Sequence, residues 1–241
     1  MTTKTYQGWC VDLLVNILQK QAQYSGSLKE YGVKSVLKSI VTHYASIYYC
    51  ADKSLSIKGC ETINIWWTHL NKNRWGKVFS RLLMSCKARK EILEIQRNRK
   101  YDLAKKKIHL EHIVPVAQTC DKLMRLKKDE ITEDTIKALL KHNKVIVLTK
   151  GEQDYLDRSG EEFIEKDFVF VKTHFSKFYD AQEEVYKGLS PRSCGSALLR
   201  MAHLKNKKVT FCNFNGDKVT PNHWIDYLES DFVIHESKKG E

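Results

Sequence analysis

Glu111 and His112 place a carboxylate beside an imidazole near the middle of this 241-residue chain. Hydrolysis of a phosphodiester requires a water molecule that loses a proton near neutral pH and a cation that neutralises charge on the phosphate. Histidine titrates in the right range for the first task, and carboxylate oxygens suit Mg²⁺ for the second. Adjacent Glu and His residues are also common, so the alternative is a histidine that is only buried or paired at the surface. The same alternative applies to His109, which would share a strand face with Glu111.

The residues downstream of this pair predict the elements that would position it. Residues 108–115 form an expected strand, which Pro115 ends, and residues 145–148 form a second strand. Thr149 and Glu152 have the spacing of a capping box, which predicts that a helix begins there. The second strand would bring Asn143 beside the first strand. Apart from an inserted helix expected over residues 132–142, the order is strand, strand, helix.

Three short motifs in this region resemble the HNH, or ββα-metal, nuclease family. They are Glu-His-Ile-Val-Pro from Glu111, Asn-Lys-Val from Asn143 with the later Leu-Thr, and an oxygen-bearing residue some five positions after Thr149. The resemblance is greatest to the HNH domains of phage homing endonucleases and CRISPR effector nucleases, and it covers about residues 107–160. Each motif is short, and their combination in this order is what favours the family.

The resemblance implies a role for each matching residue. Glu111 takes the place of the metal-binding Asp of the family, and His112 takes the place of the general base that activates the attacking water. Asn143 matches the middle Asn, which commonly braces the loop that holds the histidine. Glu is one methylene longer than Asp, so the strand would have to lie slightly further back. Thirty residues separate His112 from Asn143, more than in compact members, and the helix over 132–142 would fill this insertion.

The last metal ligand is the least determined position. Asp154 matches it if the helix follows the register of the CRISPR-type domains, where the family has Asn or His. Asp157 is the rival, and Gln153 ranks behind both. Gln153 and Asp157 are separated by four residues, at the positions where some relatives have a pair of histidines.

The resemblance therefore implies an endonuclease that hydrolyses DNA with Mg²⁺ or another divalent cation such as Mn²⁺. Restriction, anti-phage defence or phage DNA processing would be the setting. Two alternatives remain: an RNA-cleaving toxin, and a nucleic-acid-binding protein that does not cut. A symmetric homodimer would fit double-strand cleavage.

The charge of the chain favours a polyanionic partner, because the formal net charge is +12. Residues 72–107 hold thirteen Lys and Arg against three acidic residues. The alternative is a solvated helix face. Eight of these residues are candidates for contact with nucleic-acid phosphates: Arg89, Lys90, Arg97, Arg99, Lys100, Lys105, Lys106 and Lys107.

The predicted fold class is α+β, with a helical basic region over 1–106, the HNH module over 107–160 and a mixed region over 161–241. Apolar residues at helical spacing predict helices in the first fifty residues. The seven widely spaced cysteines fit reduced thiols in a cytoplasmic protein, and neither an export signal nor a membrane span is expected. Further expected elements are helices over 62–70, 75–106, 176–186 and 221–228, a strand over 168–171, and a hairpin over 209–220 with a type I′ turn at Asn215-Gly216.

Overall fold

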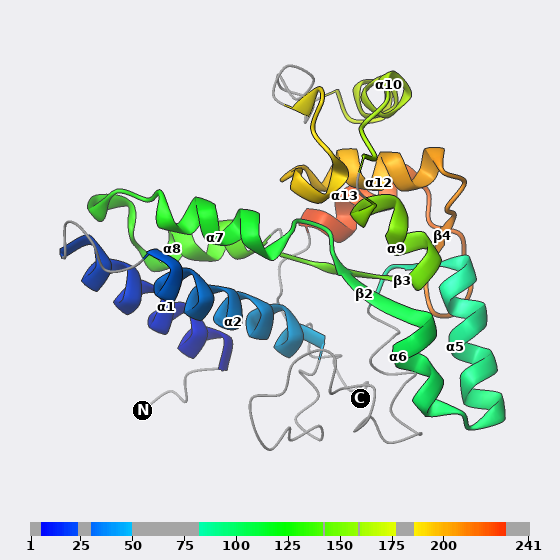
Figure 1. Cartoon of the computed structure of the whole chain (residues 1–241), viewed down its shortest axis with the longest axis horizontal. Helices are drawn as coiled ribbons and strands as arrows, with labels where there is room; N and C mark the ends of the chain where they lie inside the picture. The colour runs from blue at the N-terminus through cyan, green and yellow to red at the C-terminus, as the bar shows by residue number, and fades with distance from the viewer. Residues whose placement is uncertain are drawn as a thin grey trace, which may run out of the picture.

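The computed structural model describes six stretches of the chain, which form a mixed α+β fold (Figure 1). The stretches are residues 6–23, 30–49, 82–141, 143–158, 160–176 and 186–229. The expected α+β class is confirmed. The helix expected over 62–70 and almost all of the helix expected over 176–186 lie outside the described residues. Among the helices that are described, none is long and apolar enough to cross a membrane.

A mixed sheet of four strands in the order β2-β3-β1-β4 organises the fold. β2 (Ile108–His112) pairs antiparallel with β3 (Val145–Thr149). β1 (Met84–Ser85) runs parallel to β3 and antiparallel to β4 (Phe211–Cys212). Every residue of β3 is buried, as expected for a strand with neighbours on both sides.

The helix α9 (Lys150–Asp157) begins directly after β3 and completes the predicted order of strand, strand, helix. The Oγ1 atom of Thr149 accepts the N–H of Glu152, and the carboxylate of Glu152 accepts the N–H of Thr149. The predicted capping box is therefore confirmed. Glu152 is buried and also accepts a hydrogen bond of 2.5 Å from the hydroxyl of Ser85, so β1 helps to fix the start of this helix.

Helices fill the segment between β2 and β3, where the sequence predicts a single helix over residues 132–142. α7 (Val116–Met124) leads through the short helix η2 (Lys128–Glu130) to α8 (Glu133–Lys141). These helices pack against α1 (Tyr6–Gln23) and α2 (Glu30–Tyr49), and the four longer ones share one hydrophobic cluster. Figure 1 shows the four together, at the end of the molecule opposite α5. The N-terminal helices thus share a core with the insertion rather than forming one of their own.

The expectation of one long helix over 75–106 is wrong for its described part. α5 (Cys86–Asn98) ends at Arg99, and the short helices η1 (Tyr101–Leu103) and α6 (Ala104–Lys107) follow. Arg99 adopts a left-handed φ of 54°, and its N–H and that of the next residue bond back to carbonyls of the last turn. Such bonding closes a helix end, although it usually uses glycine.

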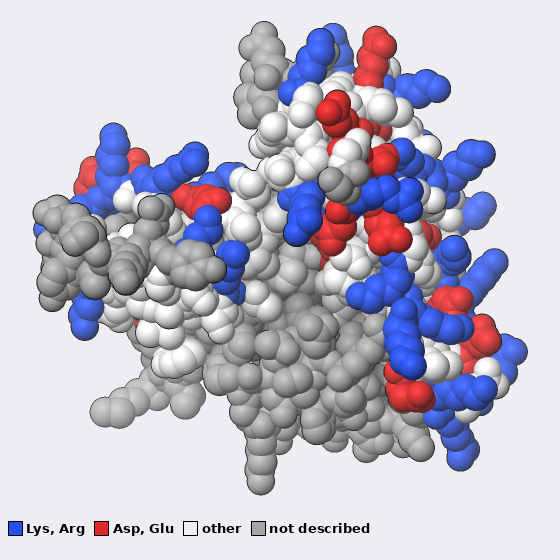
Figure 2. Space-filling view, in the orientation of Figure 1, with Lys and Arg blue, Asp and Glu red and all other residues white. Residues whose placement is uncertain are grey.

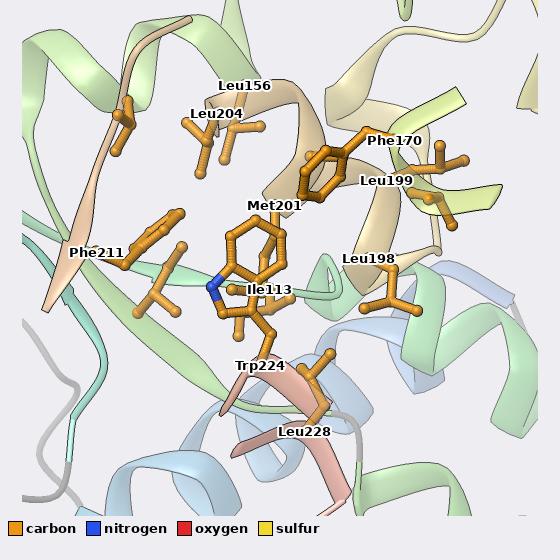
Figure 3. Close-up of a cluster of buried hydrophobic side chains, with 14 of the residues drawn as sticks. Ile113, Leu156, Phe170, Leu198, Leu199, Met201, Leu204, Phe211, Trp224 and Leu228 are labelled. Atoms are coloured by element: carbon orange, nitrogen blue, oxygen red, sulfur yellow. The ribbon is translucent and has the colours of Figure 1, made fainter. Parts of the chain in front are cut away.

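The C-terminal helices α10 (Glu165–His174), α12 (Ala197–Asn206) and α13 (Pro221–Glu229) pack around Trp224 (Figure 3). The strand expected over 168–171 is wrong, because these residues lie inside α10. The carboxylate of Asp167 accepts a backbone N–H at the start of α10 and two hydrogen bonds from side chains of α12. These contacts outweigh the strand preference of the aromatic and β-branched residues that follow.

The hairpin expected near the C-terminus forms with a different turn. Beyond β4 it continues only through a bridge between Cys212 and Lys218. Gly216 has a φ of 101°, whereas Asn215 is not among the described residues with positive φ. A type I′ turn needs positive φ at both central residues, so the predicted turn type is wrong. The side chain of Asn213 accepts two backbone N–H groups and stabilises the observed turn instead.

Candidate active site

The predicted acid and base lie at the end of β2, next to the segment that leads into β3. Antiparallel pairing of the two strands brings His112 within hydrogen-bond distance of Asn143, two residues before β3. The next residue, Ile113, donates its N–H to the carbonyl of Lys144 at 2.8 Å. Its side chain is buried in the hydrophobic cluster that Figure 3 shows. The backbone that carries the two candidate groups is therefore held by both hydrogen bonding and packing.

Asn143 determines which nitrogen of His112 carries the proton. Its Nδ2 donates to the carbonyl of Val41 at 2.9 Å, so the other side-chain atom must be the carbonyl oxygen. This oxygen lies 3.1 Å from Nδ1 of His112 and can only accept, which makes Nδ1 the donor. In a neutral ring the second nitrogen, Nε2, then has its lone pair available for a proton or a metal.

The surroundings of His112 favour the neutral ring. Burial is the main cause and lowers its pKa from 6.5 to about 4, outweighing the charge of Glu111 and the hydrogen bond to Asn143, which raise it. The charge of Arg200 lowers it further. At neutral pH the imidazole is therefore in the form that can take up a proton.

Both carboxylate oxygens of Glu111 have partners within the protein. Oε1 accepts a hydrogen bond of 2.7 Å from Arg200, and Oε2 lies 2.9 Å from Nε2 of His109. Burial alone would raise the pKa of Glu111, but the hydrogen bond from His109 and the positive charge of Arg200 bring it below its ordinary value. Glu111 is therefore an ionised and firmly oriented carboxylate.

His109 links Glu111 to the first residue of α9. Nζ of Lys150 lies 3.1 Å from Nδ1 of His109, and an ammonium group can only donate. Nδ1 must then be an acceptor, which leaves the proton on Nε2 for Glu111. Both ring nitrogens of His109 are therefore engaged within the protein.

A pocket of about 460 Å³ opens beside these groups. Its polar lining consists mainly of His109, Glu111, His112, Asp157, Arg192 and Arg200. Asp157 comes from the last turn of α9, where its Oδ2 accepts a hydrogen bond of 2.5 Å from Gln153. Asp154 is exposed and is not part of the lining. Of the three candidates for the last ligand, Asp157 is the one that the fold places at the pocket.

The side chains of this pocket do not form a closed metal cage, but they fit an open site that leaves room for waters and substrate. Within the described residues, no group of three or more His, Cys, Asp or Glu side chains lies close enough to hold a metal ion. Mg²⁺, however, commonly keeps several waters and binds through one or two carboxylates together with substrate phosphates. Glu111 and Asp157 supply two carboxylates to the pocket, and each oxygen retains a lone pair beyond its present hydrogen bond. The residues therefore fit an open oxygen site rather than a closed protein cage.

The predicted phosphate-contacting residues differ in their surroundings. The guanidinium of Arg89 is hydrogen-bonded within the protein. Its Nε donates to the carbonyl of Phe214 at 2.7 Å, and its Nη2 donates to the carbonyl of Asn215 at 2.9 Å. Lys107 pairs with Glu91.

Other candidates for phosphate contact, in and around α5 and α6, are open to solvent. Figure 2 shows Lys and Arg side chains, with some acidic ones among them, over α5 and α6. The side chain of Lys105 lies outside the description. The exposed candidates are Lys90, Arg97, Arg99, Lys100 and Lys106.

Sequence reasoning missed two arginines from the C-terminal region. Arg200 lies on α12, and Arg192 lies on the short helix η4 (Pro191–Ser193), which contacts both α9 and α12. Arg200 had a detectable signal, because it interrupts an otherwise apolar run from residue 197 to 202. A lone arginine in such a run implies a buried partner of opposite charge. Nothing in the local sequence marks Arg192.

The geometry thus gathers two imidazoles, two carboxylates and two guanidinium groups around one pocket. The residues come from β2, α9, η4 and α12, and only the first two belong to the segment that resembles a known family. No family model, curated protein or solved structure matches this chain.

Proposed function

We propose that the protein is a metal-dependent nuclease of the HNH type that hydrolyses phosphodiester bonds in DNA. One observation carries this proposal: the hydrogen bond from Nδ1 of His112 to Asn143, which leaves Nε2 as the basic nitrogen at a pocket that also contains Glu111 and Asp157. A general base must have an unprotonated nitrogen at the working pH. Burial lowers the pKa of His112 and keeps its ring neutral.

In the proposed reaction, Nε2 of His112 takes a proton from a water molecule that attacks the phosphorus in line with the leaving 3′ oxygen. Asn143 keeps the ring in the required tautomer and helps to orient it. The products would be a 5′ phosphate and a 3′ hydroxyl. Glu111 and Asp157 would hold Mg²⁺, which when bound neutralises the charge that develops on the phosphate.

Arg192 is the pocket residue best suited to contact a phosphate before reaction. It is exposed and lines the pocket, whereas Arg200 is directed to acceptors within the protein. The exposed basic residues of α5 and α6 would bind the backbone on either side of the cleaved bond. Such contacts increase affinity without reading base sequence.

RNA cleavage is the second candidate, and the two histidines at the pocket favour it. His109 and His112 both line the pocket, and Glu111 is engaged with Arg200. Two imidazoles can transfer protons to and from a 2′ hydroxyl and a leaving 5′ oxygen, a reaction of RNA that does not require a cation. Such an enzyme would cut RNA in the presence of EDTA and would leave DNA intact.

The proposal is tested by incubating the wild-type protein and His112→Ala with supercoiled plasmid and, separately, with single-stranded RNA. Each substrate is given Mg²⁺ or EDTA. The nuclease proposal predicts Mg²⁺-dependent nicking of DNA by the wild type, no nicking by His112→Ala, and DNA binding by both. Cleavage of RNA alone in EDTA supports the second candidate. Binding without cleavage of either substrate identifies a non-cutting protein and contradicts both.

A further inference from the structure

Helix α12 carries a buried arginine, Arg200, among apolar residues. Arg200 is only 2% exposed, and its neighbours Leu199, Met201 and Ala202 are fully buried. Arginine is almost never buried to this degree unless its charge is paired, because removing a guanidinium from water is costly. The acceptors that compensate Arg200 therefore explain why it is there.

All the described acceptors of Arg200 belong to three consecutive residues of the candidate site. Nη1 donates to the carbonyl oxygen of His112 at 2.7 Å and to that of Ile113 at 2.8 Å. Nη2 donates to Oε1 of Glu111 at 2.7 Å. The Nε atom has no hydrogen-bond partner among the described residues, so the guanidinium is held through its two terminal nitrogens.

These bonds act at the point where β2 ends. They fix the 112–113 and 113–114 peptide groups, the first of which is part of the backbone that carries the His112 side chain. The same group orients the carboxylate of Glu111. A planar guanidinium can satisfy three acceptors in this way, whereas an ammonium group has no such fixed geometry.

We infer that Arg200 is a positioning residue of the active site, through which α12 sets the orientation of Glu111 and His112. This makes the C-terminal region, which lies outside the segment that resembles HNH domains, part of the catalytic apparatus. The consequence for catalysis rests on the proposed nuclease function, whereas the consequence for the geometry of His112 does not.

The test compares Arg200→Ala and Arg200→Lys with the matched control Met201→Ala. Met201 is a fully buried neighbour on the same helix and belongs to the hydrophobic cluster. All three variants should melt at lower temperature than the wild type. If Arg200 positions the site, both Arg200 variants lose about 100-fold in kcat, since small misplacements have effects of this size. Their KM should stay near the wild-type value, and Met201→Ala should keep its kcat at a temperature where it is folded.

Two further measurements separate positioning from general stability. Added guanidinium ion at millimolar concentration should partly restore kcat in Arg200→Ala and not raise that of Met201→Ala. The nitrogen NMR signals of the His112 ring at neutral pH should report the Nδ1–H tautomer in the wild type and in Met201→Ala. In Arg200→Ala they should shift towards a mixture of tautomers.

An unchanged ring signal in both Arg200 variants, with a loss of kcat no larger than in Met201→Ala, would overturn the inference. Another outcome would distinguish the positioning role of Arg200 from the proposed nuclease function. If the wild type cuts no nucleic acid but the ring signal changes only in the Arg200 variants, the positioning role stands and the nuclease proposal fails.

Discussion

The side-chain oxygen of Asn143 lies 3.1 Å from Nδ1 of His112, while the amide nitrogen of the same side chain binds the carbonyl of Val41 on α2. One fully buried amide thus joins the candidate base to a helix about a hundred residues earlier in the chain. The N-terminal helices thereby contribute to the geometry of the site.

Replacement of this amide should affect stability and activity together. Asn143→Ala removes both hydrogen bonds and leaves the Nδ1–H of His112 without its acceptor, which should lower the free energy of unfolding by about 1–3 kcal/mol. The ring of His112 would no longer be held in one tautomer, so kcat should fall as well. Urea unfolding and plasmid nicking measure the two effects. A variant that unfolds like the wild type would show that the hydrogen bond to Val41 does not form in solution.

The pKa of His112 predicts how stability depends on pH. Its folded-state pKa of about 4 is below the unfolded value of 6.5, so the unfolded chain takes up a proton more readily. The neutral ring contributes stability above pH 6.5, and this contribution decreases as the pH falls from 6.5 towards 4. The loss can reach about 3 kcal/mol, because each pKa unit corresponds to about 1.4 kcal/mol. Urea unfolding at pH 7 and pH 5 measures it.

His112→Gln provides the comparison for this pH effect, because it retains an uncharged polar side chain and cannot be protonated in this range. We expect the wild type to lose more stability than the variant between pH 7 and pH 5. Equal losses in the two proteins would mean that His112 is protonated as easily in the folded state as in the unfolded one.

The two aspartates of α9 should differ in their effect on metal-dependent activity. Asp157→Asn removes a charge at the pocket, so the Mg²⁺ concentration needed for half-maximal nicking should rise. Asp154→Asn changes an exposed group that is not part of the pocket lining and should have little effect. Mg²⁺ titrations of nicking give the comparison, and the binding of Mn²⁺ measured by electron paramagnetic resonance gives it without activity. The reverse order would restore Asp154 as the last ligand.

Basic residues of α5 should fall into two groups. Arg97 is exposed, and Arg97→Ala should weaken DNA binding and reduce the slope of log K against log salt concentration by about 0.9. Arg89→Ala should instead lower the free energy of unfolding by about 1–3 kcal/mol, because it removes two hydrogen bonds to backbone carbonyls. Fluorescence anisotropy at several salt concentrations and urea unfolding, applied to both variants, distinguish the groups. Loss of affinity without loss of stability in Arg89→Ala would place it at the DNA instead.

The packing of Arg89 against the turn after β4 gives an independent test of the fold. A Cβ atom at Gly216 would lie 2.9 Å from Cζ of Arg89, and the φ of 101° is unfavourable for other residues. Gly216→Ala should therefore be destabilising. Gly151→Ala in α9 meets no atom within 4 Å and should stabilise by about 0.5–1 kcal/mol, since glycine is unfavourable inside a helix. Thermal unfolding of both variants checks this contrast, and a stable Gly216→Ala would contradict the observed turn.

The local features of the site region could be predicted from residue order alone. The spacing of Thr149 and Glu152 encodes a capping box, because its hydrogen bonds join residues three apart. The short apolar stretches over 108–115 and 145–148 predicted β2 and β3, and His112 and Asn143 marked residues that pairing of these strands brings together. Each of these signals depends on interactions within a short stretch of chain or on one strand pair.

Features that depend on distant partners became visible only in the folded chain. Residues 168–171 have strand-like composition, yet the buried bonds of Asp167 to α12 place them in a helix. Asp157 rather than Asp154 lines the pocket because of the direction in which α9 leaves β3, which no local pattern specifies. Arg200 lies 89 residues from Glu111, and the charge of a buried guanidinium is compensated only once the chain has folded around it. Short-range hydrogen bonding can be inferred from residue order, whereas the partners of a buried charge follow from the packing of the whole chain.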